Sequence, residues 1–213
     1  MVFIGIEELL RFLSGKGFLA LSPAELLYLY PVKALFVCAA LFYFRAEYGE
    51  LRLADLRNPL PTISAVLLGL LVFILWINMD WPFATFGELQ GYNPGMLPGG
   101  ASRTALIAFR LFGAALVVPV MEELFWRSFL ARYLISNDIA SVAIGRFTAT
   151  SFIMSSLLFG LEHNLFLAGI MAGVAYNLLL MKTRSILLCV VAHGVTNLAL
   201  GVYVLLYGQW KFW

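Results

Sequence analysis

The stretch Val117-Val-Pro-Val-Met-Glu-Glu-Leu-Phe-Trp-Arg-Ser-Phe129 places two adjacent glutamates and an arginine inside a long apolar segment. Ionisable groups at membrane depth are costly, so they usually face the interior of a helix bundle or a wet cavity and are paired. On a helix, Glu123 and Arg127 are four residues apart and share a face, which predicts an ion pair. Glu122 points about 100° away from Glu123 and has no cation at that spacing. The stretch therefore predicts one anchored carboxylate and one that is free for chemistry.

The composition indicates an integral membrane protein. Of the 213 residues, 62% are hydrophobic and 12% are charged, whereas soluble domains are about 45–50% apolar and about 25% charged. The net charge is +2 and no basic run exists, which argues against a nucleic-acid partner. Cys38 and Cys189 lie in separate apolar segments, where a buried hydrophobic role is favoured over a disulfide or a nucleophile. The N-terminus lacks the pattern of a removable signal peptide.

The order of apolar segments predicts an all-α bundle with about six transmembrane helices. Residues 2–13 are short and amphipathic and suit an interfacial helix. Residues 80–102 hold three prolines and five glycines, which indicates an irregular loop. Pro119 lies three residues before Glu122 and predicts a freed carbonyl and a kink. The predicted spans are residues 26–44, 62–79, 103–135, 146–162, 165–181 and 185–207.

The two histidines of the chain both lie in its apolar C-terminal half. His163 ends the segment Phe159-Gly-Leu-Glu-His163, and His193 opens His193-Gly-Val-Thr-Asn197, where the i, i+4 spacing puts the imidazole and the carboxamide on one helical face. At about 1.5 Å per residue, Glu122 lies roughly 20 Å from the end of its helix and His163 roughly 26 Å from the start of its own. These similar depths predict one site inside the membrane slab.

Taken together and in this order, the motifs Glu122-Glu123-x-x-x-Arg127, Phe159-x-x-x-His163 and His193-x-x-x-Asn197 resemble the type II CAAX prenyl endopeptidase and bacteriocin-processing (CPBP, or Abi) family of intramembrane proteases. The segment Leu68–Asp80 looks like the CAAX-protease-related branch associated with bacterial exosortase systems. Trp126-Arg-Ser128 departs from the Phe-Arg-Gly of many members but leaves the polar positions intact.

The resemblance implies a division into an N-terminal membrane region, residues 1–102, and a catalytic core, residues 103–207. It also implies an endopeptidase of the bacterial inner membrane that acts on a membrane-anchored protein or peptide.

The roles that the resemblance implies are chemically reasonable. Glu122, with His163, activates a water molecule as general base, and His193 and Asn197 donate hydrogen bonds to the oxyanion of the tetrahedral intermediate. Glu123 and Arg127 form the supporting pair. No cofactor is needed by this mechanism.

Alternatives remain open from the residues themselves. Two histidines and a glutamate can also form a catalytic zinc site with an open fourth position. The spacing His-Glu-x-x-His is missing, however, and an asparagine suits an oxyanion better than zinc. Polar residues on several membrane helices can also mark a transport path, or a membrane binding or immunity factor without catalysis. Repeated halves, which are typical of transporters, are not detected.

Lysine and arginine in the connections predict the orientation of the chain. They are most frequent in the connections at 45–57, 132–146 and 182–184. The positive-inside rule predicts that these connections are cytoplasmic and that both termini lie outside.

Overall fold

The computed structural model describes residues 10, 12–14, 16, 18–19, 21–87 and 91–213. Over these residues the secondary structure is helical and contains no strand, which confirms the all-α prediction. The interfacial helix expected at residues 2–13 lies largely outside the described residues. The α-helices are α2 (Pro23–Leu26), α3 (Leu29–Tyr43), α4 (Pro59–Ile77), α5 (Ala101–Phe112), α6 (Val118–Glu123), α7 (Ala131–Tyr133), α8 (Ala149–Leu161), α9 (Phe166–Thr183) and α10 (Ile186–Tyr207). Short 3₁₀ turns occupy Arg45–Glu47, Leu53–Arg57, Pro82–Ala84, Pro94–Met96, Ile139–Ser141 and Trp210–Phe212.

Five helices of the described chain are long and apolar enough to cross a membrane, and α8 is a shorter apolar helix beside them. The five are Ala24–Tyr43, Pro59–Ile77, Ala101–Tyr133, Phe166–Thr183 and Ile186–Tyr207. The sixth predicted span, residues 146–162, is therefore shorter than expected. Gly145 adopts a positive φ of 74°, and Thr148 caps the helix by accepting a hydrogen bond from Ser151 N. The turn at Gly145 and this cap together delay the start of α8 until Ala149.

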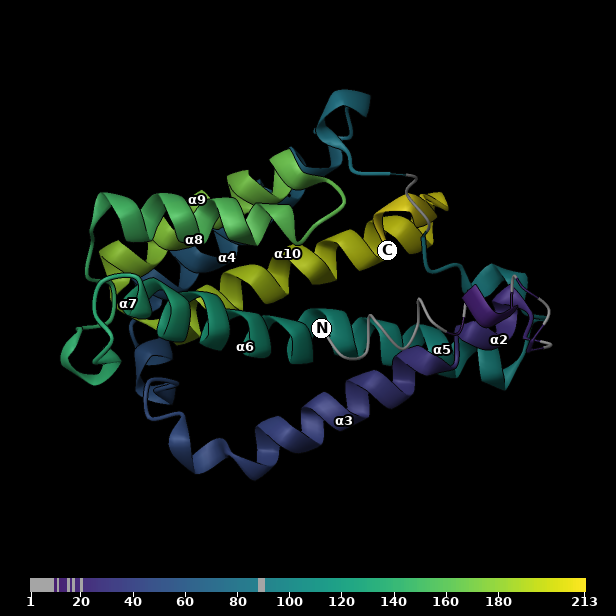
Figure 1. The fold of residues 1–213 in the computed structure, drawn as a ribbon, viewed down its shortest axis with the longest axis horizontal. Helices are drawn as coiled ribbons and strands as arrows, with labels where there is room; N and C mark the ends of the chain where they lie inside the picture. Colours follow the sequence, from purple (N-terminus) through teal and green to yellow (C-terminus); the bar gives the residue numbers. More distant parts are fainter. Residues whose placement is uncertain (1–9, 11, 15, 17, 20, 88–90) are drawn as a thin grey trace.

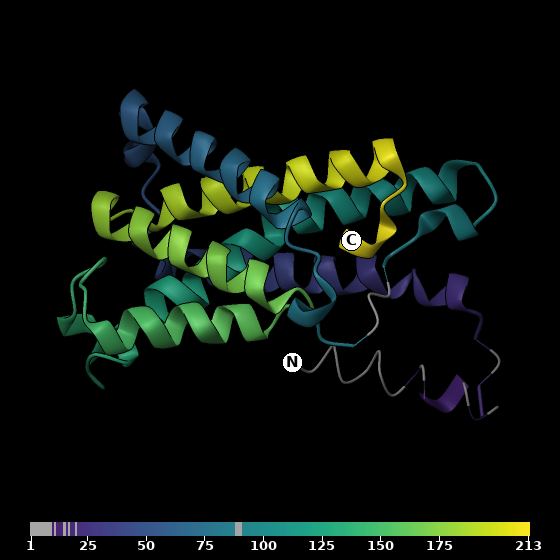
Figure 2. The same ribbon diagram turned by 90° about the horizontal axis from the view of Figure 1, so that it is seen from above.

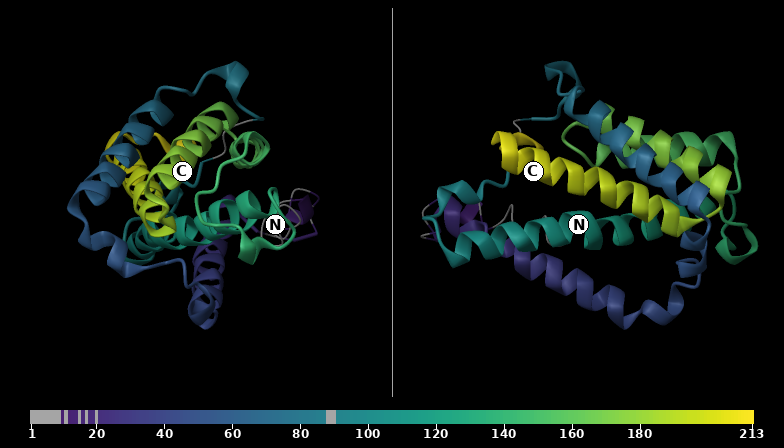
Figure 3. Two further views of the ribbon diagram at one scale, coloured as in Figure 1. Left: turned by 90° about the vertical axis from the view of Figure 1, so that its left-hand side faces the viewer. Right: turned by 180° about the vertical axis from the view of Figure 1, so that it is seen from behind.

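The long helices run roughly along one direction and form a bundle (Figure 1). Helix α10 packs against α4 on one side and against the α5–α6 helix on the other, while α8 and α9 form an antiparallel hairpin (Figures 1 and 2). Helix α3 contacts α5 and diverges from the bundle towards its C-terminal end (Figures 1 and 3). The central helix α10 thus has neighbours on several sides, as its ten buried residues show.

The third span is one continuous run with two π-helical segments in place of a simple break. These segments are Gly113–Val117 and Leu124–Leu130, and they flank α6. A π-helical bond runs from residue i to residue i+5, so the carbonyl of Ala114 faces position 119. Pro119 has no N–H group to offer it. The freed carbonyl expected from Pro119 is therefore present, and the distortion takes a π-helical form.

Buried polar side chains join the helices around the core. The hydroxyl of Tyr176 on α9 donates to Thr196 Oγ1 on α10 at 2.8 Å, and Thr196 donates to the carbonyl of Gly69 on α4 at 2.8 Å. Nδ2 of Asn177 donates to the hydroxyls of Ser155 and Ser156 on α8, each at 2.9 Å. These bonds explain the serines of α8 as packing groups, because hydrogen bonds between helices satisfy polar groups that water does not reach.

Candidate active site

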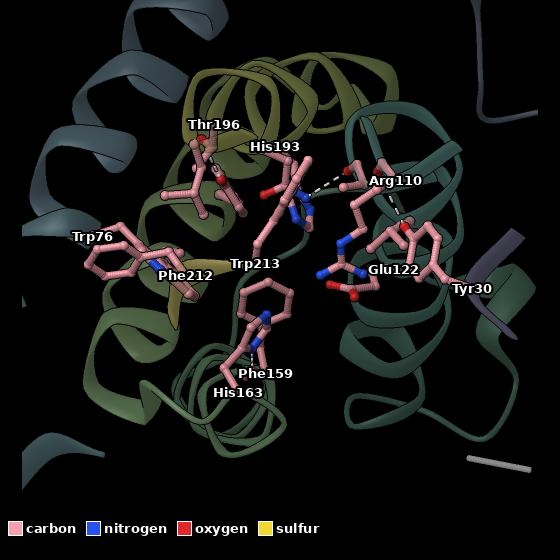
Figure 4. Close-up of a pocket in the computed structure, with 16 residues that line it drawn as sticks. Tyr30, Trp76, Arg110, Glu122, Phe159, His163, His193, Thr196, Phe212 and Trp213 are labelled. Carbon is pink, nitrogen blue, oxygen red and sulfur yellow. Dashed lines mark hydrogen bonds between the residues drawn. The ribbon is translucent and has the colours of Figure 1, made fainter. Parts of the chain in front are cut away.

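A cavity of about 220 Å³ lies inside the bundle, large enough for several water molecules. It is lined by residues from the five candidate spans, from α8 and its link to α9, and from the C-terminal turn. Its lining includes Tyr30, Trp76, Arg110, Ala114, Val118, Glu122, Phe159, His163, Ala172, Tyr176, His193, Thr196, Asn197, Leu200, Phe212 and Trp213. The four residues assigned to catalysis from the sequence, Glu122, His163, His193 and Asn197, therefore share one cavity (Figure 4).

The ion pair expected between Glu123 and Arg127 is present and fully buried. Arg127 Nη1 lies 3.2 Å from Glu123 Oε1, with side-chain exposures of 1% and 0%. The same carboxylate oxygen lies 2.9 Å from His193 Nδ1. The guanidinium of Arg127 also lies over the ring of Phe159, 4.1 Å from its centroid. Glu123 therefore contacts both Arg127, in the same span, and His193 on α10. The sequence predicted only the first of these contacts.

Glu122 is held differently from its neighbour. It lines the cavity, and its Oε2 is buried without a hydrogen-bond partner among the described residues. The free carboxylate that the helical rotation predicts is thus found on the cavity wall. An unpartnered buried carboxylate oxygen is costly in a protein interior, so this atom is available to a water molecule or a substrate proton.

His163 lies in the link between α8 and α9. Its Nδ1 is 2.8 Å from the carbonyl oxygen of Phe159. A carbonyl only accepts hydrogen bonds, so Nδ1 carries the proton and Nε2 of the neutral ring holds a lone pair. The edge-to-face packing of Trp76 against the ring, at 5.3 Å between centroids, further fixes its orientation. The hydrogen bond to Phe159 and the packing of Trp76 therefore fix the orientation of the His163 ring.

Asn197 compensates for the proline in the opposite helix. Its Nδ2 donates to the carbonyl of Ala114 at 2.8 Å, the carbonyl that Pro119 leaves without a helical donor. Gly194 allows this approach, because a Cβ there would lie 2.7 Å from the carbonyl oxygen of Ala115. One N–H of the Asn197 amide is used in this way, and the other remains for the cavity that the residue lines.

Sequence reasoning missed several contributors to the cavity. The ring of Tyr176, which lines the cavity, stacks on His193, with centroids 5.2 Å apart and planes at 23°. The C-terminal residues Phe212 and Trp213 fold back onto the cavity. One signal was available in the sequence, because Arg110, Ala114, Val118 and Glu122 recur every four residues and so form one helical stripe.

The family comparison agrees with the fold and the cavity. Comparisons with curated proteins and with solved structures find no match to the chain. The exosortase-associated branch stays a prediction. Five helices of the described chain that are long and apolar enough to cross a membrane indicate an integral membrane protein. Residues 104–199 match the model of the type II CAAX prenyl endopeptidase Rce1-like family, and this range holds Glu122, His163, His193 and Asn197.

Proposed function

We propose that the protein is an intramembrane endopeptidase that hydrolyses a peptide bond of a membrane-associated protein or peptide. The observation that carries this proposal is the unpartnered Glu122 carboxylate in one cavity with two histidines and an asparagine. A base, a second proton acceptor and hydrogen-bond donors around one water-sized space are what water-activated hydrolysis of a peptide bond requires.

Glu122 and His163 are the groups that activate water. Among the described residues, Oε2 of Glu122 has no hydrogen-bond donor to compete with the water, and the bond from His163 Nδ1 to Phe159 leaves Nε2 as an acceptor. A water molecule between them loses a proton to this pair as its oxygen attacks the scissile carbonyl carbon. The proton then passes to the departing nitrogen as the C–N bond breaks, which leaves a carboxylic acid and an amine.

His193 and Asn197 are the donors to the oxyanion, and the hydrogen bonds of the fold restrict how they act. Asn197 retains one N–H after bonding to Ala114. His193 directs Nδ1 to Glu123, so in the neutral ring with a proton on Nδ1 its Nε2 can only accept. Donation from Nε2 to an oxyanion therefore requires a proton on both ring nitrogens. Glu123 is then the carboxylate that balances the imidazolium.

Zinc-dependent hydrolysis is the alternative mechanism. Within the described part of the chain, no group of three or more histidine, cysteine, aspartate or glutamate side chains is placed to hold a metal ion. Both histidines use Nδ1 in a protein hydrogen bond, which leaves Nε2 of each ring for water, substrate or a metal, and Glu122 is the one carboxylate among the residues that line the cavity. Our proposal is the metal-independent mechanism, and we derive no step through a metal.

The position of the site among membrane helices supports a substrate that lies in or near the bilayer. A cavity enclosed by membrane helices receives a peptide that is anchored in the bilayer or drawn into it, and the family description adds prenylated CAAX proteins as a candidate substrate class. A sorting-tagged precursor in the bacterial inner membrane is the other candidate, which rests on the exosortase resemblance.

The test compares membrane proteins from cells that lack the gene with those from cells that carry the parent protein or Glu122→Gln. We expect the same uncleaved precursors to accumulate without the gene and with Glu122→Gln, and to be processed by the parent. Mass spectrometry of their termini identifies the cut. Processing by Glu122→Gln at the parental rate would rule out the proposed general base.

A further inference from the structure

Arg110 is a charged residue of the cavity that the hydrolytic mechanism does not use. It lies three helical repeats of four residues before Glu122, with Ala114 and Val118 between them, and all four line the same cavity. The two intervening side chains are small. The wall of the cavity formed by α5 and α6 thus carries a cation and, twelve residues further along the helix, the carboxylate base; Figure 4 labels both side chains.

The surroundings of Arg110 are aromatic. Its guanidinium carbon lies 4.4 Å from the ring centroid of Tyr30 and 5.2 Å from that of Tyr92. Its Nε is buried without a hydrogen-bond partner, and no carboxylate pairs with it among the residues that the structure describes. The hydroxyl of Tyr30 also lies at Arg110, where it donates to the backbone carbonyl of Arg110 at 3.5 Å, but the cation–π contacts and this phenol bring no negative charge to balance the guanidinium.

Tyr92 does not supply the missing negative charge. It lies in the connection before α5, and burial raises its pKa to about 12, although the nearby Arg110 acts in the opposite direction. The phenol is therefore neutral near pH 7. The ring positions the guanidinium, and the charge of the guanidinium remains available to an anion.

A second buried donor in the same cavity also lacks an acceptor. Nε1 of Trp213 has no hydrogen-bond partner within the described part of the chain, and the side chain is 8% exposed. The backbone of Trp213 is fixed, since its carbonyl accepts a hydrogen bond from Tyr92 N at 2.8 Å. Two unsatisfied donors on one cavity indicate a ligand that brings oxygen acceptors, because buried donors are nearly always paired.

We propose that Arg110 binds a carboxylate of the substrate peptide and thereby sets which peptide bond reaches Glu122. This inference rests on the proposed protease function and adds the chemistry of its substrate. A guanidinium matches a carboxylate in a planar, two-bond geometry. The carboxylate is either an aspartate or glutamate side chain or the C-terminal group of the peptide, and the structure is equally suited to both.

The distance along the helix between Arg110 and Glu122 sets how many peptide residues separate the bound carboxylate from the scissile bond. Twelve residues at about 1.5 Å each separate Arg110 from Glu122 by about 18 Å. Both side chains lean towards the helix N-terminus, and the arginine is the longer one. An extended peptide covers about 3.3–3.6 Å per residue, so the carboxylate lies about five or six residues from the scissile bond.

The experiment uses the full-length protein in detergent with neutral, lipid-anchored peptides whose C-terminus is amidated. One set carries a single aspartate at successive positions, a second carries none, and a third carries none but has a free C-terminal carboxylate. Binding is measured by fluorescence anisotropy with Glu122→Gln as the non-cleaving background, and cleavage by mass spectrometry with the parent. The two carboxylate sets distinguish the side-chain source from the C-terminal source.

We expect at least one carboxylate peptide to bind about tenfold to a hundredfold more tightly than the neutral one, because hydrogen bonds to charged groups contribute about 1.5–3 kcal/mol. Arg110→Met should abolish this preference, and Arg110→Lys should retain part of it. Arg103→Met is the matched control, since Arg103 lies on the same helix outside the cavity. Moving the aspartate by one residue should move the cut by one residue.

Equal binding of carboxylate and neutral peptides by the parent would overturn the inference, as would an unchanged preference in Arg110→Met that unfolds at the parental temperature. If Arg110→Met does not fold, Arg110→Gln decides: loss of the preference in a variant that unfolds at the parental temperature supports the inference, and an unchanged preference overturns it. Cleavage that ignores the carboxylate refutes the inference but keeps the protease. Carboxylate-dependent binding without any cleavage supports the role of Arg110 and refutes the proposed protease function.

Discussion

Replacing each of the two adjacent glutamates by glutamine should produce opposite effects on stability and activity. In Glu123→Gln, the buried oxygen that both Arg127 and His193 contact loses its charge. The guanidinium of Arg127 is 1% exposed and already has two nitrogens without a hydrogen-bond partner in the described structure. Stranding a buried charge costs about 3–5 kcal/mol. The cation–π contact of Arg127 with Phe159 is worth at most about 2 kcal/mol, and it does not offset this cost because the parent protein has the same contact.

In Glu122→Gln, no ion pair is broken and the side-chain volume is kept. We expect the free energy of unfolding to change by less than about 1 kcal/mol, because neutralising an unpartnered buried carboxylate removes a desolvation penalty. At about 2–4 °C per kcal/mol for a chain of this size, Glu123→Gln should lower the unfolding temperature by on the order of 10 °C. Glu122→Gln should stay within a few degrees of the parent and lose hydrolysis.

The assay is thermal unfolding of both variants in the same detergent, paired with cleavage of a membrane-anchored substrate. The two substitutions are isosteric and one residue apart, so each is the control for the other. Equal destabilisation of the two variants would show that the helix presents both carboxylates to similar surroundings, and full activity of Glu122→Gln would remove it from the role of base.

Three further predictions concern the metal, the helix contact and the packing network. Stripping metal from the purified protein should leave hydrolysis by Glu122 intact, with elemental analysis of the same sample as the check; loss of activity that stoichiometric zinc restores would contradict this. Gly194→Ala should destabilise the protein by about 1–3 kcal/mol, since the new methyl group overlaps the carbonyl of Ala115. The unfolding temperature and the cleavage activity of this variant should both be lower than those of the parent. Asn177→Ala removes the donor to Ser155 and should cost about 1–3 kcal/mol, with unchanged activity per folded molecule, because it lies outside the cavity.

The fold was largely predictable because bilayer thickness and apolar length determine each span. The third span was expected at residues 103–135 and occurs at Ala101–Tyr133. The exception is α8, where apolar residues continue the pattern but a positive φ at Gly145 interrupts it. A hydropathy pattern does not report a single backbone angle, so the start of this helix could not be found from the sequence.

The site was predictable only where its contacts are local. The spacing of Glu123 and Arg127 predicts their pair because one helix determines it. The contact of Glu123 with His193 joins positions 70 residues apart and depends on how α6 and α10 are rotated against each other. That rotation depends on packing at Gly194 and on the carbonyl that Pro119 frees, and neither is encoded in a helical period.

The contact between Glu123 and His193 bears directly on the chemistry of the oxyanion. His193 can donate through Nε2 only when Nδ1 also carries a proton, because Nδ1 faces the Glu123 carboxylate. In that form the imidazolium and Arg127 balance Glu122 and Glu123, so the four charges sum to zero inside the bundle. Isolated charges at membrane depth are costly, and paired ones much less so. In the proposed mechanism, we therefore expect Glu123 to compensate the charge of the oxyanion donor His193 as well as to anchor Arg127.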